Sequence, residues 1–150
     1  MPNLVLNETY KCKIKKKIVE DDVEYFILID EFNDNHLLET SFFNDYNLKI
    51  GETYNFRVDK INCKGKIFFE PEHPVYKLNE IYEFYFVEKQ TKTNKENQEF
   101  YLLIFTDNIN TFCDMEVDKK EFENSYFPQQ KIKAKVVRTK KARLIIEKTE

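Results

Sequence analysis

Residues that could perform catalysis or bind a metal are few and widely separated in this 150-residue chain. The histidines are His36 and His73, and the cysteines are Cys12, Cys63 and Cys113. No Cys-x-x-Cys pair is present and neither histidine has a second ligand at useful spacing, so no zinc site is predicted. The two glycines, Gly51 and Gly65, cannot build a glycine-rich phosphate loop. We therefore expect a protein without enzymatic activity, metal or cofactor.

The remaining reactive groups favour structural roles. Cys63 and His73 could act as nucleophile and base, but nothing in the sequence orients them. The carboxylates fall in expected turns and on solvated strand faces, which disfavours paired acid–base catalysis. The string Glu70-Pro71-Glu72-His73-Pro74 contains two prolines, which stiffen the chain and exclude regular strand pairing. We interpret this string as a rigid strut between two domains, 1–74 and 75–150.

Aromatic side chains are the strongest candidates for ligand binding, because their rings can stack on unpaired bases. The candidates are Phe26, Phe32 and Phe68 in the first half of the chain and Tyr101, Phe105 and Phe112 in the second. The chain has 14 Phe and 9 Tyr, so most of these rings must fill a core. Core packing is therefore the alternative interpretation of each candidate.

Charge is distributed unevenly along the chain. The net charge of −3 excludes a globally basic nucleic-acid binder but leaves room for a local basic face. Residues 1–74 carry 10 basic and 14 acidic side chains, whereas residues 75–150 carry 14 and 13. The densest basic cluster comprises Lys131, Lys133, Lys135, Arg138, Lys140, Lys141 and Arg143, and a second strip comprises Lys11, Lys13, Lys15, Lys16 and Lys17. These residues could contact phosphates, or they could be a solvated strand face that protects a sheet edge.

The elements that position these residues are predicted to be strands. Val, Ile, Tyr, Phe and Thr together account for 54 of 150 residues, and alanine occurs only at Ala134 and Ala142. The longest run without a polar side chain is Tyr25 to Ile29, so no transmembrane helix is predicted. Residues 1–17 show no secretory signal. The odd, scattered cysteines argue against a disulfide framework, and a reducing cytoplasmic location is expected.

An internal repeat divides the chain into two similar halves. Leu6-Asn7-Glu8-Thr9-Tyr10 recurs as Leu78-Asn79-Glu80-Ile81-Tyr82, an offset of 72 residues. Tyr25 to Ile29 recurs as Phe100 to Ile104, and Lys66 to Glu70 recurs as Arg143 to Glu147. A repeat of this length corresponds to a complete folded unit rather than to one element of a solenoid.

Each half has the same predicted order of elements. The first half is expected to form strands at 10–19, 23–30, 36–40, 53–61 and 66–70, with a short helix that Ser41 can cap and that ends near Leu48. The second is expected to form strands at 80–89, 98–106, 111–117, 131–139 and 142–148, with a short helix around 118–126. Three strands, a short helix and two strands is the order of a five-stranded OB barrel. The predicted fold is therefore all-β, with two tandem OB-type barrels.

The strand pattern also resembles a known family. The stretch from Gly51 to Asn62, followed by Gly65 to Glu70, resembles the end of an S1-type RNA-binding domain, and Gln130 to Glu147 is similar. Phe26 and Tyr101 match the aromatic residue of that family's second strand. The usual histidine near the end of the third strand is replaced by Glu39. The resemblance implies S1-like barrels that bind single strands on the face of strands two and three, beside the loop between strands four and five.

We predict a cytoplasmic protein that binds single-stranded nucleic acid, RNA in preference to DNA, by aromatic stacking and basic strips. The basic hairpin at 131–143 favours this hypothesis. The alternative is a protein-interaction module whose acidic first barrel docks a basic partner or a partner strand. The acidic balance and Glu39 favour that alternative. No contact with a membrane is expected.

Overall fold

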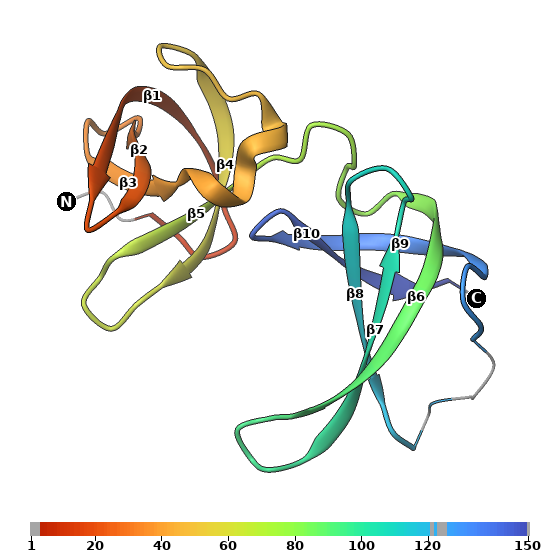
Figure 1. Ribbon diagram of the computed structural model, residues 1–150. Helices are drawn as coiled ribbons and strands as arrows, with labels where there is room; N and C mark the ends of the chain where they lie inside the picture. The colour runs from red at the N-terminus through yellow and green to blue at the C-terminus, as the bar shows by residue number, and fades with distance from the viewer. Residues whose placement is uncertain (1–3, 121, 123–125, 150) are drawn as a thin grey trace. The chain divides into compact units, whose positions relative to one another are not determined.

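The computed structural model describes residues 4–120, 122 and 126–149 (Figure 1). The chain divides into two compact units, Met1–Val75 and Tyr76–Glu150, and each is described here by itself. Both units consist mostly of β-strands, in agreement with the composition. Within the described residues, no helix is long and apolar enough to cross a membrane.

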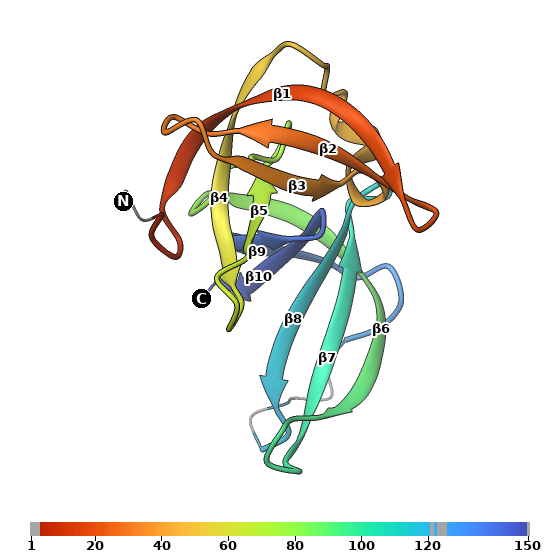
Figure 2. The same ribbon diagram turned by 90° about the vertical axis from the view of Figure 1, so that its left-hand side faces the viewer.

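The first unit is a five-stranded antiparallel sheet with one short helix. Its elements are β1 (Thr9–Glu20), β2 (Val23–Ile29), β3 (Asn35–Glu39), η1 (Thr40–Tyr46), β4 (Thr53–Ile61) and β5 (Ile67–Pro71). The strands lie in the order β3-β2-β1-β4-β5, and the curved sheet is seen in Figure 2. No ladder is found between β3 and β5 in the part of the chain that the structure describes.

The second unit has the same strand order but is closed into a barrel. Its strands are β6 (Ile81–Thr93), β7 (Glu99–Thr106), β8 (Phe112–Asp118), β9 (Lys131–Lys140) and β10 (Arg143–Lys148). They are arranged as β10-β8-β7-β6-β9. Closure comes from a short parallel ladder in which Leu144 lies beside Cys113 and Ile145 beside Asp114. The third and fifth strands, which share no ladder in the described part of the first unit, are thus joined in the second.

Strand alternation places one face of each strand in a core. In β7, Leu103 and Phe105 are fully buried in one core cluster with Phe84 of β6 and Val136 of β9. The register shifts in the first and fourth strands of both units, between Ile14 and Lys16, Val58 and Lys60, Phe86 and Glu88, and at Val137. Such bulges bend a strand, and here they let the sheets curve around their cores.

The repeated Leu-Asn-Glu string encodes a specific turn. Its asparagine adopts a positive φ, 71° at Asn7 and 69° at Asn79, a conformation that asparagine tolerates well. The amide of Asn7 donates to the carbonyl of Val58, and the amide of Val58 donates to the carbonyl of Glu8. The same exchange occurs at Asn79-Glu80 with Val136, at Gly51-Glu52 with Ile14, and at Gln129-Gln130 with Phe86. One turn geometry therefore opens the first and fourth strands of both units.

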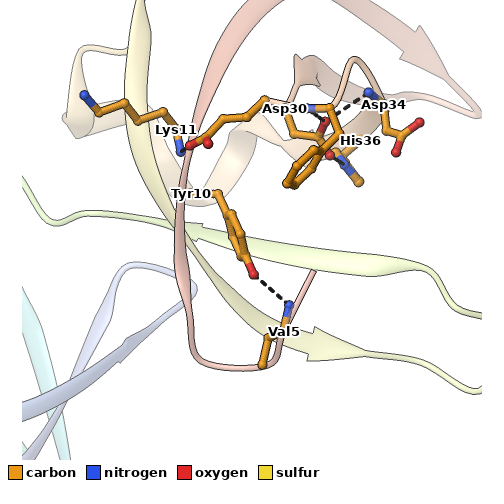
Figure 3. A network of polar contacts seen from close by, with 8 residues as sticks. Val5, Tyr10, Lys11, Asp30, Asp34 and His36 are labelled. Carbon is orange, nitrogen blue, oxygen red and sulfur yellow. Dashed lines mark hydrogen bonds and ion pairs between the residues drawn. The ribbon is translucent and has the colours of Figure 1, made fainter. Parts of the chain in front are cut away.

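A tyrosine completes three of these turns. The Tyr10 hydroxyl accepts a hydrogen bond from the Val5 amide at 2.9 Å (Figure 3). The Tyr82 hydroxyl accepts one from the Lys77 amide at 3.0 Å, and the Tyr54 hydroxyl accepts one from the Lys49 amide at 2.9 Å. Each tyrosine thus satisfies an amide that the turn would otherwise leave unpaired.

Three expectations about local structure need correction or lie outside the described residues. The helix predicted to end near Leu48 is a 3₁₀-helix over Thr40–Tyr46. Ser41 lies inside this helix and does not cap it, and its hydroxyl donates to the Glu39 carboxylate. Pro71 is not in an unpaired joint but ends β5 opposite Phe56, because the last residue of a strand at a sheet edge need not donate an amide. In the range 118–126, where a short helix was expected, Asp118 ends β8, and residues 121 and 123–125 lie outside the described residues.

Candidate nucleic-acid interface

The six candidate aromatic residues have different environments. Phe105 is fully buried and Phe26 is 8% exposed, so both fill the cores and neither can stack on a base. Tyr101 is half-buried and packs against Phe122, with the Lys89 ammonium 4.4 Å from its ring centre. The exposed rings are Phe32 at 44%, Phe68 at 38% and Phe112 at 46%. The prediction of stacking surfaces at Phe26 and Phe105 is therefore wrong, because both rings lie on the inward faces of their strands.

Phe68 lies among lysines in the first unit. Lys60 lies opposite Phe68 in the β4–β5 ladder, with its ammonium 5.8 Å from the ring centre. The Lys66 ammonium lies 5.0 Å from the same ring centre. Lys64 is exposed in the connecting turn. We call Lys60, Lys64, Lys66 and Phe68 the β4–β5 cluster.

The turn that carries this cluster is held by its own hydrogen bonds. The Asn62 side-chain oxygen accepts the amides of Lys64 at 3.0 Å and Lys66 at 2.8 Å. Gly65 has a φ of +83°, which glycine adopts without strain. Lys64 and Lys66 thus lie on a turn whose backbone is held by hydrogen bonds, which reduces the conformational entropy lost when the turn binds a ligand.

The charges of the β4–β5 cluster are not neutralised by the protein. Lys60, Lys64 and Lys66 form no ion pair with any residue that the structure describes. Their ammonium groups are therefore available to an anion. Sequence reasoning selected Phe68 but missed these lysines, although the i, i+2 spacing of Lys66 and Phe68 places both on one strand face.

A pocket adjoins the cluster where β3 faces β5. Its volume is about 390 Å³, and it is lined by Ile27, Asn35, His36, Leu37, Gly65, Lys66 and Ile67. Ile27 and Leu37 lie opposite each other in the β2–β3 ladder. The pocket therefore combines the face of the second and third strands with the turn between the fourth and fifth.

His36 is held at this pocket by Asp30 (Figure 3). The His36 Nε2 lies 2.8 Å from the Asp30 Oδ2, and the ring packs edge-on against Phe69 with centroids 4.9 Å apart. The other Asp30 oxygen accepts the amides of Phe32 at 2.8 Å and Asp34 at 3.0 Å. Burial raises the pKa of Asp30, but the hydrogen bonds with His36, Asp34 and Phe32 outweigh it and hold the pKa below its ordinary value.

Asp107 has the matching place in the second unit. One of its oxygens accepts three amides of the β7–β8 turn, and the other accepts the Tyr76 hydroxyl at 2.7 Å. Burial raises the pKa of Asp107, but the hydrogen bond from Tyr76 and those from the turn amides bring it below its ordinary value. These two carboxylates stabilise turns, which is one of the two places where the sequence analysis expected carboxylates.

The second unit offers a less basic surface than expected around Arg143. Its guanidinium binds Asp114 through two hydrogen bonds, 2.8 Å from Nε to Oδ2 and 2.6 Å from Nη2 to Oδ1. It also lies 5.6 Å from the Phe112 ring centre, so it partly covers that exposed ring. The hydrogen bond to Asp114 raises the pKa of Arg143. The charge of Arg143 is thus partly neutralised by Asp114.

The predicted basic strip on β9 lies away from the second unit's candidate aromatic residues. Lys131, Lys133 and Lys135 are paired along β9 with residues of β6, and Lys131 forms an ion pair with Glu83 at 3.6 Å. In the barrel, β6 separates β9 from β7, and β10 separates it from β8. Arg138, Lys140 and Lys141 are exposed at the end of the β9–β10 hairpin. Lys131, Lys133 and Lys135 are therefore separated by one strand from the strands that carry Tyr101 and Phe112, whereas Arg143 of the same predicted cluster lies at Phe112.

The lysine strip of the first unit reaches one candidate ring, the buried Phe26, whose centre lies 5.6 Å from the Lys17 ammonium. Lys11, Lys13, Lys15, Lys16 and Lys17 are all exposed on β1. Beyond the bulge, Lys16 lies beside Ile27 in the ladder and Lys17 lies beside Phe26. Successive residues of a strand point to opposite faces, and none of these five lysines is among the described residues that line the pocket.

A second groove lies between the β6–β7 turn and the end of β8. Its volume is about 1020 Å³, and its lining includes the acidic Glu99, Glu116 and Asp118 together with three lysines. Lys119 within it is already paired with Glu99 at 3.0 Å. Among the described residues, no group of three or more His, Cys, Asp or Glu side chains could hold a metal ion.

Comparisons with known proteins give limited information. No protein-family model and no curated protein matches the chain. Among solved structures, the chain is similar to a multidomain protein with nucleic acid binding domains from Streptococcus pneumoniae, with 11% sequence identity and a TM-score of 0.34. The similarity covers 98% of this chain and 54% of that one, so this chain spans about half that protein's length. At this level of similarity, function must be inferred from the chain's own residues.

Proposed function

We propose that both units are OB-type barrels and that the chain is a non-enzymatic protein that binds single-stranded nucleic acid. The shared strand order, with a short helix after the third strand of the first unit, supports the OB assignment. The single observation that carries the function is the β4–β5 cluster, an exposed ring between lysines that form no ion pair with the described residues, beside the face of β2 and β3. Single strands are bound by this combination of stacking and positive charge.

RNA is the preferred ligand in this proposal, following the resemblance to S1-type domains. An OB-type unit contacts about 4–16 nucleotides, and each stacked base contributes about 1–3 kcal/mol. With one favourable ring and three lysines, the affinity should be modest and depend strongly on salt.

A protein-interaction role for the second unit is the other candidate. Asp114, Glu116 and Asp118 alternate along β8 with the inward residues Cys113 and Met115, so they share its outward face. Asp114 also neutralises Arg143. An acidic face repels phosphates and would suit a basic protein partner.

Fluorescence anisotropy with labelled random-sequence RNA and DNA tests the proposal. Wild-type protein is compared with the Lys64→Ser/Lys66→Ser variant and with the control Lys133→Ser/Lys135→Ser, which removes the same charge from β9. For single strands, the slope of log K against log salt is about −0.7 per phosphate contact. The first variant loses two contacts, so its slope should be less negative than that of the wild type by about 1.4. The control should keep the wild-type slope.

Three results would overturn the proposal. Absence of binding to any oligonucleotide at low salt removes the nucleic-acid function and directs attention to a protein partner. An equal loss in both variants means that net charge, and not the β4–β5 cluster, determines binding. A loss confined to the control would place the interface on β9.

A further inference from the structure

The two units differ at one place that their shared strand order makes comparable. In the second unit, the parallel ladder between β8 and β10 joins the third and fifth strands. The Arg143–Asp114 pair lies across the same two strands. In the first unit, no ladder joins β3 to β5 within the described residues, and the 390 Å³ pocket lies at that position. The place between the third and fifth strands is thus filled by paired strands in the second unit and is an open pocket in the first.

The pocket has the size and chemistry for one planar heteroaromatic ring. Ile27, Leu37 and Ile67 supply apolar contact for the faces of a ring. Small-molecule pockets usually have volumes of about 300–1,000 Å³, so this one lies at the lower end and fits a small ligand. Asn35 and His36 add polar groups able to reach the edge of a ring. A nucleobase has this combination of apolar faces and a hydrogen-bonding edge.

Asn35 is the polar group best placed to choose among bases. Its amide offers a donor and an acceptor, and it makes no side-chain hydrogen bond to any residue that the structure describes. The Nε2 of His36, in contrast, is already engaged by Asp30. An asparagine amide pairs with the N6 donor and N7 acceptor of adenine. The corresponding position in the second unit, 77 residues later, is Phe112, which has no polar group.

Lys66 connects the pocket to the rest of the interface. Its side chain lines the pocket and also lies over the Phe68 ring. A base in the pocket would therefore carry its phosphate toward Lys66, while the next base could stack on Phe68. The pocket and the β4–β5 cluster can thus act on consecutive nucleotides of one strand.

We propose that the pocket between β3 and β5 binds one unstacked adenine base of a single strand, with Asn35 pairing to its edge. This inference rests on the proposed nucleic-acid function and adds base preference to it. The second unit, whose corresponding place is closed by the β8–β10 ladder, contributes no such preference.

The experiment compares fluorescein-labelled oligo(A), oligo(C) and oligo(U), each about 12 nucleotides long, with full-length protein. The expected preference for oligo(A) is about five- to 150-fold, the range of one bidentate base contact. An oligo(U) carrying one central adenine should recover most of that preference, because the pocket holds a single base. Asn35→Ala should remove the preference and leave the affinity for oligo(C) and oligo(U) unchanged. Asn110→Ala, an exposed asparagine in the β7–β8 turn, is the matched control and should behave as wild type.

The outcomes separate this inference from the function on which it rests. If no oligonucleotide binds, the proposed function fails and the base preference fails with it. If all three homopolymers bind equally, the function stands and the adenine pocket is wrong. If oligo(A) is preferred but Asn35→Ala keeps the preference, the preference comes from stacking and the role of Asn35 is refuted.

Discussion

Phe68 and Phe69 are neighbours in β5 that should respond to substitution in opposite ways. Phe68 is 38% exposed and lies beneath two lysines, whereas Phe69 is 5% exposed and packs against Phe56 and His36. Successive residues of a strand point to opposite faces. Phe68→Ala should therefore weaken ligand binding, and Phe69→Ala should destabilise the first unit.

The magnitudes follow from the two environments. Removing a core phenylalanine costs about 3–5 kcal/mol, so Phe69→Ala should lower the free energy of unfolding by that amount. Full burial of such a side chain contributes about 1.5–3 kcal/mol. Because Phe68 is partly exposed, Phe68→Ala should lower the free energy of unfolding by about 1–2 kcal/mol. Loss of one stacked base costs about 1–3 kcal/mol of binding, which raises the Kd for RNA by about five- to 150-fold.

Two assays separate these effects. Urea unfolding followed by far-ultraviolet circular dichroism gives the stability of each variant, and anisotropy under conditions where each variant is folded gives the Kd. Phe68→Tyr is the matched control, because it keeps a ring at the same exposed position and should keep wild-type affinity. The interpretation of the interface is refuted if Phe68→Ala binds RNA as tightly as wild type while remaining folded.

Two further predictions concern Asp107 and the cysteines. The pKa of Asp107 is lower in the folded than in the unfolded protein, so its stabilising effect is complete above the unfolded pKa of about 3.9 and is lost as the pH falls through the folded pKa. Asp107→Asn should destabilise the second unit by on the order of 1–3 kcal/mol at neutral pH. It should also reduce the loss of stability at acid pH, as measured by urea unfolding across a pH series. A variant that loses stability at acid pH as steeply as the wild type would contradict this assignment. Burial, with the Asp30 and Glu31 carboxylates, raises the pKa of Cys12 to about 12, and burial also raises that of Cys113, while Cys63 is exposed in the β4–β5 turn. Maleimide should therefore modify Cys63 first, as followed by mass spectrometry, and saturating RNA should slow that reaction; an unchanged rate would mean that the turn lies outside the interface.

The sequence was a good guide to the strands and their order. Period-two alternation placed β4 at its observed bounds, and the recurring Leu-Asn-Glu string marked turns whose asparagines adopt a positive φ. These features are local, since they depend on the side-chain alternation of a strand and on the backbone preferences of single residues. Lengths were less accurate for β6, which continues past the expected residue 89 to Thr93 and is paired with β7 to that point.

The candidate site was predicted only in part. Phe68 and the turn between strands four and five were identified, but Phe26 and Phe105 were placed on the wrong face. In β2, Phe26 is flanked by Tyr25 and Ile27, so apolar residues occupy both faces and alternation cannot tell which one is inward. The role of Arg143 was also missed, because its partner Asp114 is 29 residues away in the sequence.

The sequence by itself determined the β class, the two similar halves and the residues at which each chain segment turns, because these follow from neighbours along the chain. The tertiary structure alone decided which rings are exposed, which cations are already paired, and that a ladder joins β8 to β10 whereas none joins β3 to β5 in the described chain. Each of these depends on contacts between residues far apart in sequence. The open place beside Asn35 is therefore a property of strand pairing and not of any local motif.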